Sequence, residues 1–353
     1  MTIEWLAGNR LRGTSAEKPV LGLQSPSVGG WVELGRTTLG SSGDSISIAS
    51  LPDKRYYMLL GNHFKTGAIA HALQMNSDTG TSYNNRCSIS GGADFTNVSR
   101  TRLENWGSGN TNPDFLVAYV SNLASKEKLV TEHFVDRGTA GAGNAPNRRE
   151  NVGKWSNTSN SISEFDSFNY GAGDFTTGSE VVVLGWDPAD THTTNFWEEL
   201  ASVTLGSAGS TIDSGTITAK KYLWFQIFNG GLSSSGVTGI RFNSDGSNNY
   251  AERRSGNGGS DVTGTSRPVL NLVHTGTTTP QFSNCFVINN SSNEKLVISH
   301  SVSQNTAGAG TAPNRSECAD KWANTSSQIT SVQAIASAGN FPSGSILKVW
   351  GSD

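Results

Sequence analysis

The chain has 353 residues, a formal net charge of −3 and a pI near 6.1, so it offers no basic surface for nucleic acid. Only 16% of its residues are charged, yet 35% are hydrophobic and 8% aromatic, which favours a folded chain over a disordered one. No apolar run approaches the roughly 20 residues of a membrane-spanning helix. We therefore expect no nucleic-acid partner and no membrane partner.

The first segment, residues 1–30, has no counterpart elsewhere in the chain. It lacks the apolar stretch of a signal peptide, so we expect synthesis in the cytoplasm. The segment is mildly basic. With Trp5, Arg10 and Arg12 as candidate contact residues, we expect an extended arm that anchors the protein to an acidic protein surface.

The rest of the chain is written twice, as copies 31–187 and 197–353 joined by the linker 188–196. Residues 139–159 read TAGAGNAPNRRENVGKWSNTS and residues 306–326 read TAGAGTAPNRSECADKWANTS. Across the longer windows 127–162 and 294–329, 22 of 36 positions are identical without a gap. The offset between copies is 166 at both ends and 167 in the middle. Such duplication predicts two similar domains and argues against one asymmetric catalytic centre.

Each copy alternates short apolar runs with glycine-rich turns, a pattern typical of a β-sandwich or barrel rather than of βαβ units. The runs are rich in β-branched and aromatic residues and lie at 56–60, 115–120, 181–184, 222–228 and 285–288. We therefore predict an all-β protein.

Within this all-β protein we predict one short helix per copy, around 147–155 and 314–322. Each segment begins with Pro-Asn and carries Glu150 or Glu317 three residues after the Asn, as in a capping box. Trp155 and Trp322 would pack these helices onto the sandwich. The alternative is an irregular crossover loop.

Histidine and acidic residues are the first place to look for chemistry. His133 and His300 are the only duplicated histidines, and no nucleophile motif accompanies them. We interpret them as half-buried structural residues, with a catalytic or metal role as the less favoured alternative. The duplicated acids, Glu33 with Glu199 and Glu150 with Glu317, are candidates for the carboxylate pair of a glycosidase. We interpret these as structural too.

The duplicated loops and arginines also favour structural roles. Asn-Ser-Asp at 76–78 and 243–245 has one carboxylate per loop, too few for calcium, so we expect tight Asx turns. Asp94 and Asp261 follow Gly-Gly and are interpreted as turn residues. For Arg148 and Arg315 we expect ion pairs at the edge of the unit or at a subunit contact.

The cysteines form neither a disulfide framework nor a zinc site, because Cys87, Cys285 and Cys318 each align with a different residue type in the other copy. We expect free thiols near the cores. Since the chain also has no P-loop, dinucleotide fingerprint or GxSxG motif, we predict no enzyme activity, no cofactor and no metal.

Three blocks carry a resemblance to a known class of proteins. They are WLAGNRLRGT at 5–14, GGWVEL at 29–34, and the TAGAG…APNR…KW.NTS repeat. These are similar to structural proteins of tailed-phage virions, especially aquatic phages, including capsid decoration (cement) proteins and fibre or knob proteins. The resemblance implies two tandem jelly-roll-like β-sandwich domains, and a location on the outer surface of the virion.

Three functional hypotheses follow. The favoured one is a capsid decoration protein that binds the major capsid protein or another virion protein through its arm, as a homo-oligomer, with a trimer as our guess. The second is a tail-fibre or appendage protein that binds host glycans, with Trp106 and Trp186 as candidate sugar-stacking residues, neither of which is duplicated. The third and least favoured is a glycan-degrading enzyme.

Overall fold

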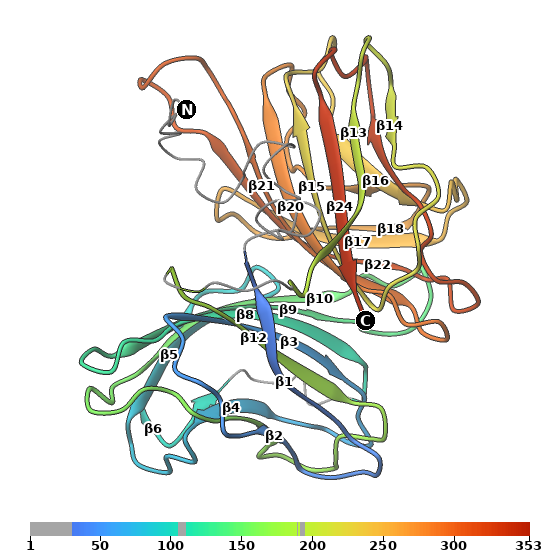
Figure 1. The fold of residues 1–353 in the computed structure, drawn as a ribbon. Helices are drawn as coiled ribbons and strands as arrows, with labels where there is room; N and C mark the ends of the chain where they lie inside the picture. The colour runs from blue at the N-terminus through green and yellow to red at the C-terminus, as the bar shows by residue number, and fades with distance from the viewer. Residues whose placement is uncertain (1–29, 105–110, 189, 191–194) are drawn as a thin grey trace, which may run out of the picture.

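The computed structural model describes residues 30–104, 111–188, 190 and 195–353, and it is an all-β protein made of two jelly-roll-like β-sandwiches. Figure 1 shows the two copies as separate sandwiches, one above the other. The arm residues Trp5, Arg10 and Arg12, together with Trp106, lie outside the described residues. Among the described residues, no helix has the length and apolar character needed to cross a membrane.

Copy one contains an eight-stranded antiparallel sheet in the order β1-β12-β3-β8-β9-β10-β5-β6, covered by a four-stranded sheet in the order β2-β11-β4-β7. The strands are β1 (Val32–Thr38), β2 (Ser45–Ile48), β3 (Tyr56–His63), β4 (His71–Met75), β5 (Tyr83–Ile89), β6 (Phe95–Arg100), β7 (Leu103–Glu104), β8 (Asp114–Ser121), β9 (Lys128–Asp136), β10 (Asn147–Trp155), β11 (Phe165–Asn169) and β12 (Glu180–Trp186).

Copy two repeats this plan with sheets β13-β24-β15-β20-β21-β22-β17-β18 and β14-β23-β16-β19. Its strands are β13 (Glu198–Thr204), β14 (Thr211–Asp213), β15 (Tyr222–Asn229), β16 (Thr238–Phe242), β17 (Tyr250–Gly256), β18 (Val262–Arg267), β19 (Leu270–Asn271), β20 (Gln281–Ile288), β21 (Lys295–Ser303), β22 (Asn314–Trp322), β23 (Val332–Ala336) and β24 (Ile346–Ser352). The bulge in β1 between Glu33 and Gly35 recurs in β13 between Glu199 and Ala201, so the duplication extends to local irregularities.

The two segments that we predicted as helices are strands, and that prediction was wrong. β10 pairs along its whole length with β9, and from Arg149 to Trp155 with β5; β22 pairs along its whole length with β21, and from Ser316 to Trp322 with β17. The capping-box spacing misled because both faces of this strand carry polar residues that are buried, so no apolar alternation marks it. Trp155 and Trp322 are nevertheless buried against the sandwich, as expected, each only 1% exposed.

Strand β3 shows how one apolar run serves two cores. Tyr57 and Leu59 point into the core between the two sheets of copy one, whereas Met58 and Leu60 point the other way. Successive side chains of a strand alternate between faces, so an uninterrupted apolar run indicates a strand that is covered on both sides.

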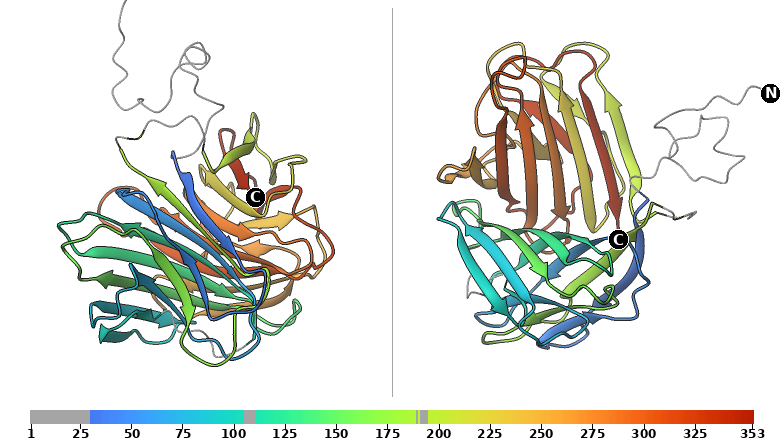
Figure 2. Two further views of the ribbon diagram at one scale, coloured as in Figure 1. Left: turned by 60° about the horizontal axis from the view of Figure 1, so that its bottom comes forward. Right: turned by 90° about the vertical axis from the view of Figure 1, so that its left-hand side faces the viewer.

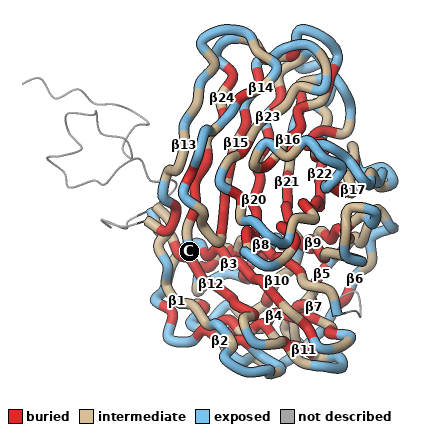
Figure 3. Tube along the Cα trace, turned by 90° about the vertical axis from the view of Figure 1, so that its right-hand side faces the viewer, coloured by how far each residue is buried: buried red, intermediate tan, exposed pale blue. Residues whose placement is uncertain are grey.

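The cover on the second side is the other copy. The two eight-stranded sheets pack on each other through an apolar cluster that includes Met58, Leu60, Phe115, Val182 and Leu184 from copy one and Tyr222, Phe286, Ile288, Ile298 and Trp350 from copy two. Figure 2 shows the two copies packed against each other, and Figure 3 shows buried residues on both sides of the contact. The protein therefore has a core in each sandwich and a third apolar cluster between the copies, and we call this third cluster the seam.

Candidate functional site

A polar cleft of about 550 Å³ opens at one end of the seam, where strands and turns of both copies meet. The turn after β5 and the turn after β17 both line it. The first of these turns comes very close to copy two. Gly91 has φ of +77°, and a Cβ there would lie 2.5 Å from the backbone nitrogen of Asp261, so this position in the turn requires glycine.

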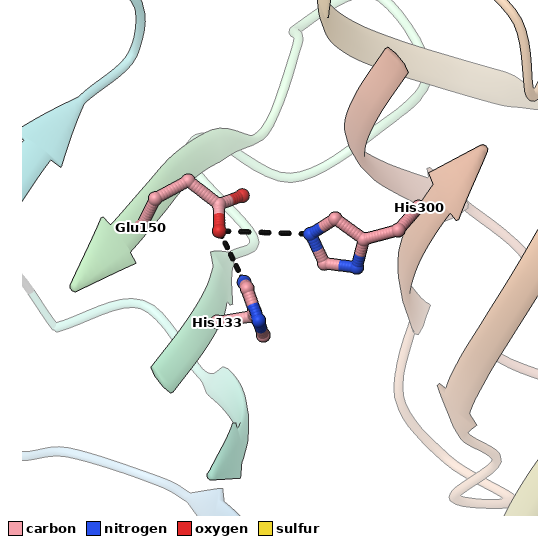
Figure 4. Close-up of side chains that lie close together, drawn as sticks. All are labelled: His133, Glu150 and His300. Atoms are coloured by element: carbon pink, nitrogen blue, oxygen red, sulfur yellow. Dashed lines mark hydrogen bonds and ion pairs between the residues drawn. The ribbon is translucent and has the colours of Figure 1, made fainter. Parts of the chain in front are cut away.

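Two histidines and a glutamate converge beside this cleft, as Figure 4 shows. His133 lies on β9 and Glu150 directly opposite it on the neighbouring strand β10. His300 comes from β21 of the other copy. Since His300 is the repeat of His133, the packing of the copies brings the one duplicated histidine pair together across the seam, with ring centroids 4.1 Å apart.

The three side chains meet at one carboxylate oxygen. Oε2 of Glu150 accepts a hydrogen bond and ion pair from Nδ1 of His133, and it lies 3.6 Å from Nε2 of His300. Nε2 of His300 is buried and makes no hydrogen bond to any described residue. All three ligand-type atoms lie within 4.8 Å of one another.

Arg148 supports this cluster from the side. Its side chain is 4% exposed, and its guanidinium binds both carboxylate oxygens of Asp261 in the other copy, at 2.8 and 3.3 Å. Its Nη1 also lies 3.2 Å from Glu150 Oε1 and 3.2 Å from Glu317 Oε2. The equivalent Arg315 is largely exposed and forms an ion pair with Glu317 of its own copy at 3.4 Å, so the two copies use the duplicated arginine differently.

These contacts shift the protonation of the cluster. Burial disfavours the charged form of both His133 and Glu150. For His133 the nearby Glu150 carboxylate outweighs burial and raises the pKa. For Glu150 the pKa is lowered, because His133 and His300 outweigh burial. The site therefore combines a carboxylate that stays charged with two adjacent imidazoles, a set suited to binding a cation or exchanging a proton.

The duplicated acids are all engaged in ion pairs. Glu33 and Glu199 are apart, in separate ion pairs with Arg36 and Lys348. Glu150 and Glu317 share the Arg148 guanidinium. A general acid needs a raised pKa, whereas that of Glu150 is lowered.

The remaining predicted residues have structural partners. Asp78 and Asp245 accept hydrogen bonds from Trp155 Nε1 and Trp322 Nε1 at 2.7 and 2.8 Å, and each also caps its own turn. The Asx-turn interpretation is thus confirmed. Asp261 is more than a turn residue, because it pairs with Arg148 across the seam. The three cysteines are buried and free, as expected.

Trp186, the described candidate for sugar stacking, is half-buried and stacks on Tyr56 with ring centroids 5.4 Å apart. Tyr56 is 39% exposed. In copy two a hollow of about 360 Å³ is lined by the exposed Phe228, Phe282 and Val302.

Copy one also contains a buried polar cluster that sequence reasoning missed. His63 Nδ1 contacts Asp114 Oδ1 at 2.7 Å, and His63 Nε2 lies 3.3 Å from Ser167 Oγ. This resembles a hydrolase triad in geometry, but all three residues are at most 1% exposed, so no substrate reaches the serine. Copy two replaces the three by the neutral residues Asn229, Gln281 and Ala334, so the cluster is specific to copy one.

The histidine–glutamate cluster had a signal in the sequence. His133 and Glu150, and likewise His300 and Glu317, lie opposite each other once 128–136 and 147–155 are paired as a hairpin. Interpreting 147–155 as a helix concealed this. That the two hairpins meet across the seam depends on how the sheets pack, for which the sequence has no local signature.

Comparison with known proteins leaves the chain without a family. No protein-family model matches it, and neither does any curated protein sequence. Among solved structures, domains LG4-5 of the mouse laminin α1 chain are similar over 92% of this chain and 89% of theirs, at 9% identity and a TM-score of 0.19. The LG1-3 region of the laminin α2 chain is similar over 87% of this chain and 64% of its own, at 7% identity and a TM-score of 0.22. At these TM-scores neither likeness bears on function.

Proposed function

We propose that this protein is a non-enzymatic structural component of a tailed-phage virion, a decoration or cement protein anchored to the outer capsid surface by residues 1–30. The proposal rests on the resemblance of its sequence blocks to such virion proteins. It is supported by one feature of the body, which is the place where the arm joins it.

That junction lies at the seam. Trp31, the residue after the arm, packs against the seam cluster and against Tyr119, and its carbonyl oxygen accepts a hydrogen bond from the backbone nitrogen of Phe196 at 2.7 Å. A load on the arm therefore reaches both copies together. The junction also lies at the β1 edge of the large sheet, whereas the polar cleft lies beside β10 and β5 near the opposite edge. An arm bound to the capsid would therefore leave the polar cleft, at the other side of the sheet, exposed to solvent.

The arm is tested by deleting residues 1–30 and mixing the truncated protein with particles that lack it. We expect both sandwiches to remain folded, because each has its own core, and attachment to be lost. Attachment that persists in the truncated protein would remove the anchoring role.

A count of copies on purified particles by cryo-electron microscopy decides between head and tail. Hundreds of copies over the shell support decoration. A few copies at a vertex or on the tail would instead support the alternative, a fibre or appendage protein that binds host glycans. The observation that favours this alternative is the half-buried stack of Trp186 on exposed Tyr56. In that case Trp186→Ala and Tyr56→Ala should each abolish binding on a glycan array, whereas Phe228→Ala, an exposed aromatic in copy two, should not.

A further inference from the structure

The cluster of His133, Glu150 and His300 has the donor set of a transition-metal site. Two imidazole nitrogens and one carboxylate oxygen form a set that proteins use for Zn²⁺, with an open position left for water. Metal–ligand distances of about 2.0–2.2 Å place donors around one ion roughly 3–3.5 Å apart. The three donor atoms already lie within 4.8 Å of one another, so side-chain adjustments are enough to enclose an ion.

The state of His300 is the independent observation that points to a ligand. Its Nε2 is buried, makes no hydrogen bond to a described residue, and is directed at Glu150 Oε2 from 3.6 Å (Figure 4). At 3.6 Å the carboxylate is too far for a hydrogen bond, so this buried ring nitrogen keeps an unused lone pair or N–H, and a metal ion between it and Glu150 would be bound by that nitrogen.

Glu150 is held in position for this role. Arg148 binds its other oxygen, Oε1, at 3.2 Å and is itself fixed by Asp261. Such outer contacts orient a metal-binding carboxylate. The adjoining cleft of about 550 Å³ gives the ion a path from solvent and leaves room for water ligands.

We propose that His133, Glu150 and His300 bind one divalent transition-metal ion, Zn²⁺ in preference to Ca²⁺ or Mg²⁺, and that this ion links the two copies across the seam. The ligands come from β9 and β10 of copy one and β21 of copy two, so the bound ion stabilises the packed arrangement of the sandwiches over any separated one. The proposal does not depend on the virion role.

The test uses the full, untagged chain after treatment with a chelator. Titration with ZnCl₂ in a calorimeter should show saturable binding of one ion per chain and a rise in melting temperature, with no such binding for CaCl₂ or MgCl₂. Co²⁺ should produce the visible absorption of a nitrogen- and oxygen-coordinated ion. His133→Gln and His300→Gln should each weaken Zn²⁺ binding by about tenfold or more, the scale of an impaired site.

His274→Gln is the matched control, because His274 is a partly buried histidine of copy two outside the cluster. The Zn²⁺ affinity of this variant should equal that of the parent chain. If His133→Gln fails to fold, the Zn²⁺ affinity of His300→Gln decides the test. This substitution should leave the fold intact, since Nε2 of His300 makes no hydrogen bond that it would break. Absence of saturable Zn²⁺ binding in the parent chain, or unchanged affinity in His300→Gln, would overturn the proposal.

Discussion

The duplicated tryptophans Trp155 and Trp322 have the same role in both copies. Trp155 and Trp322 each stack on a tyrosine, Tyr83 or Tyr250, with centroids 6.3 Å apart, and each donates its indole N–H to the aspartate of a nearby turn. One side chain therefore ties a sheet strand, a core and a turn together.

We expect Trp155→Ala and Trp322→Ala each to lower the free energy of unfolding by about 3–5 kcal/mol, because each leaves a large cavity and an aspartate without its donor. Denaturant unfolding measures this. Trp186→Ala is the control and should cost less, since Trp186 is only half-buried. Unchanged stability in either core variant would contradict the assignment.

At the seam, the pair of His133 and Glu150 links stability to pH. The raised pKa of His133 means that its contribution is complete below the ordinary value of 6.5 and is lost as the pH rises through the raised pKa. The lowered pKa of Glu150 means that its contribution is complete above its ordinary value of 4.5 and is lost as the pH falls. The pair thus stabilises the protein most between about pH 4.5 and the raised pKa of His133.

Comparison of the parent chain with Glu150→Gln should reveal this window. The stability difference between them, measured by denaturant unfolding in metal-free buffer from pH 4 to 9, should be largest inside the window and shrink on both sides. A difference that is constant with pH would mean that the pair contributes no linked protonation.

At the scale of elements, the five apolar runs of the sequence all lie in strands, but β10 and β22 were predicted as helices and are strands as well. Runs such as 181–184 are apolar on both faces and rich in β-branched residues, so their local composition is enough to identify them. β10 and β22 carry polar or charged residues on both faces. Some of these residues pair with partners distant in sequence, for example Arg148 with Asp261, and no local pattern encodes such partners. The candidate site was missed for the same reason, because His300 is far from His133 and Glu150 in the sequence.

The strand assignment of β10 can be tested at Val152, which lies mid-strand with its side chain 51% exposed. β10 is an interior strand between β9 and β5, so Val152→Pro removes a ladder hydrogen bond and should cost at least about 2 kcal/mol of stability. Val152→Thr keeps the backbone donor and should change stability little. If both variants unfold at the same denaturant concentration, Val152 does not lie in a paired strand.

At the scale of the whole molecule, the two copies are joined through the seam, where each copy covers part of an apolar sheet face of the other. A β-sandwich alone would expose that face to solvent, and exposed apolar patches of this kind promote association. The seam therefore explains why the large sheets are apolar on both sides, and it places the repeated histidines in contact.

Leu59 and Leu60 separate the contribution of the seam from that of the copy core. They are consecutive on β3 and fully buried, yet Leu59 faces the core of copy one and Leu60 the seam. A buried aspartate is strongly unfavourable at either place. We expect Leu59→Asp to unfold copy one. Leu60→Asp should instead part the copies and leave each sandwich folded, with a larger radius of gyration in X-ray scattering, new hydrogen exchange at seam strands, and self-association through the exposed faces. Loss of the copy-one core in Leu60→Asp, seen as exchange throughout β2, β4 and β11, would mean that copy one depends on the seam to fold and that the two copies form one cooperative unit.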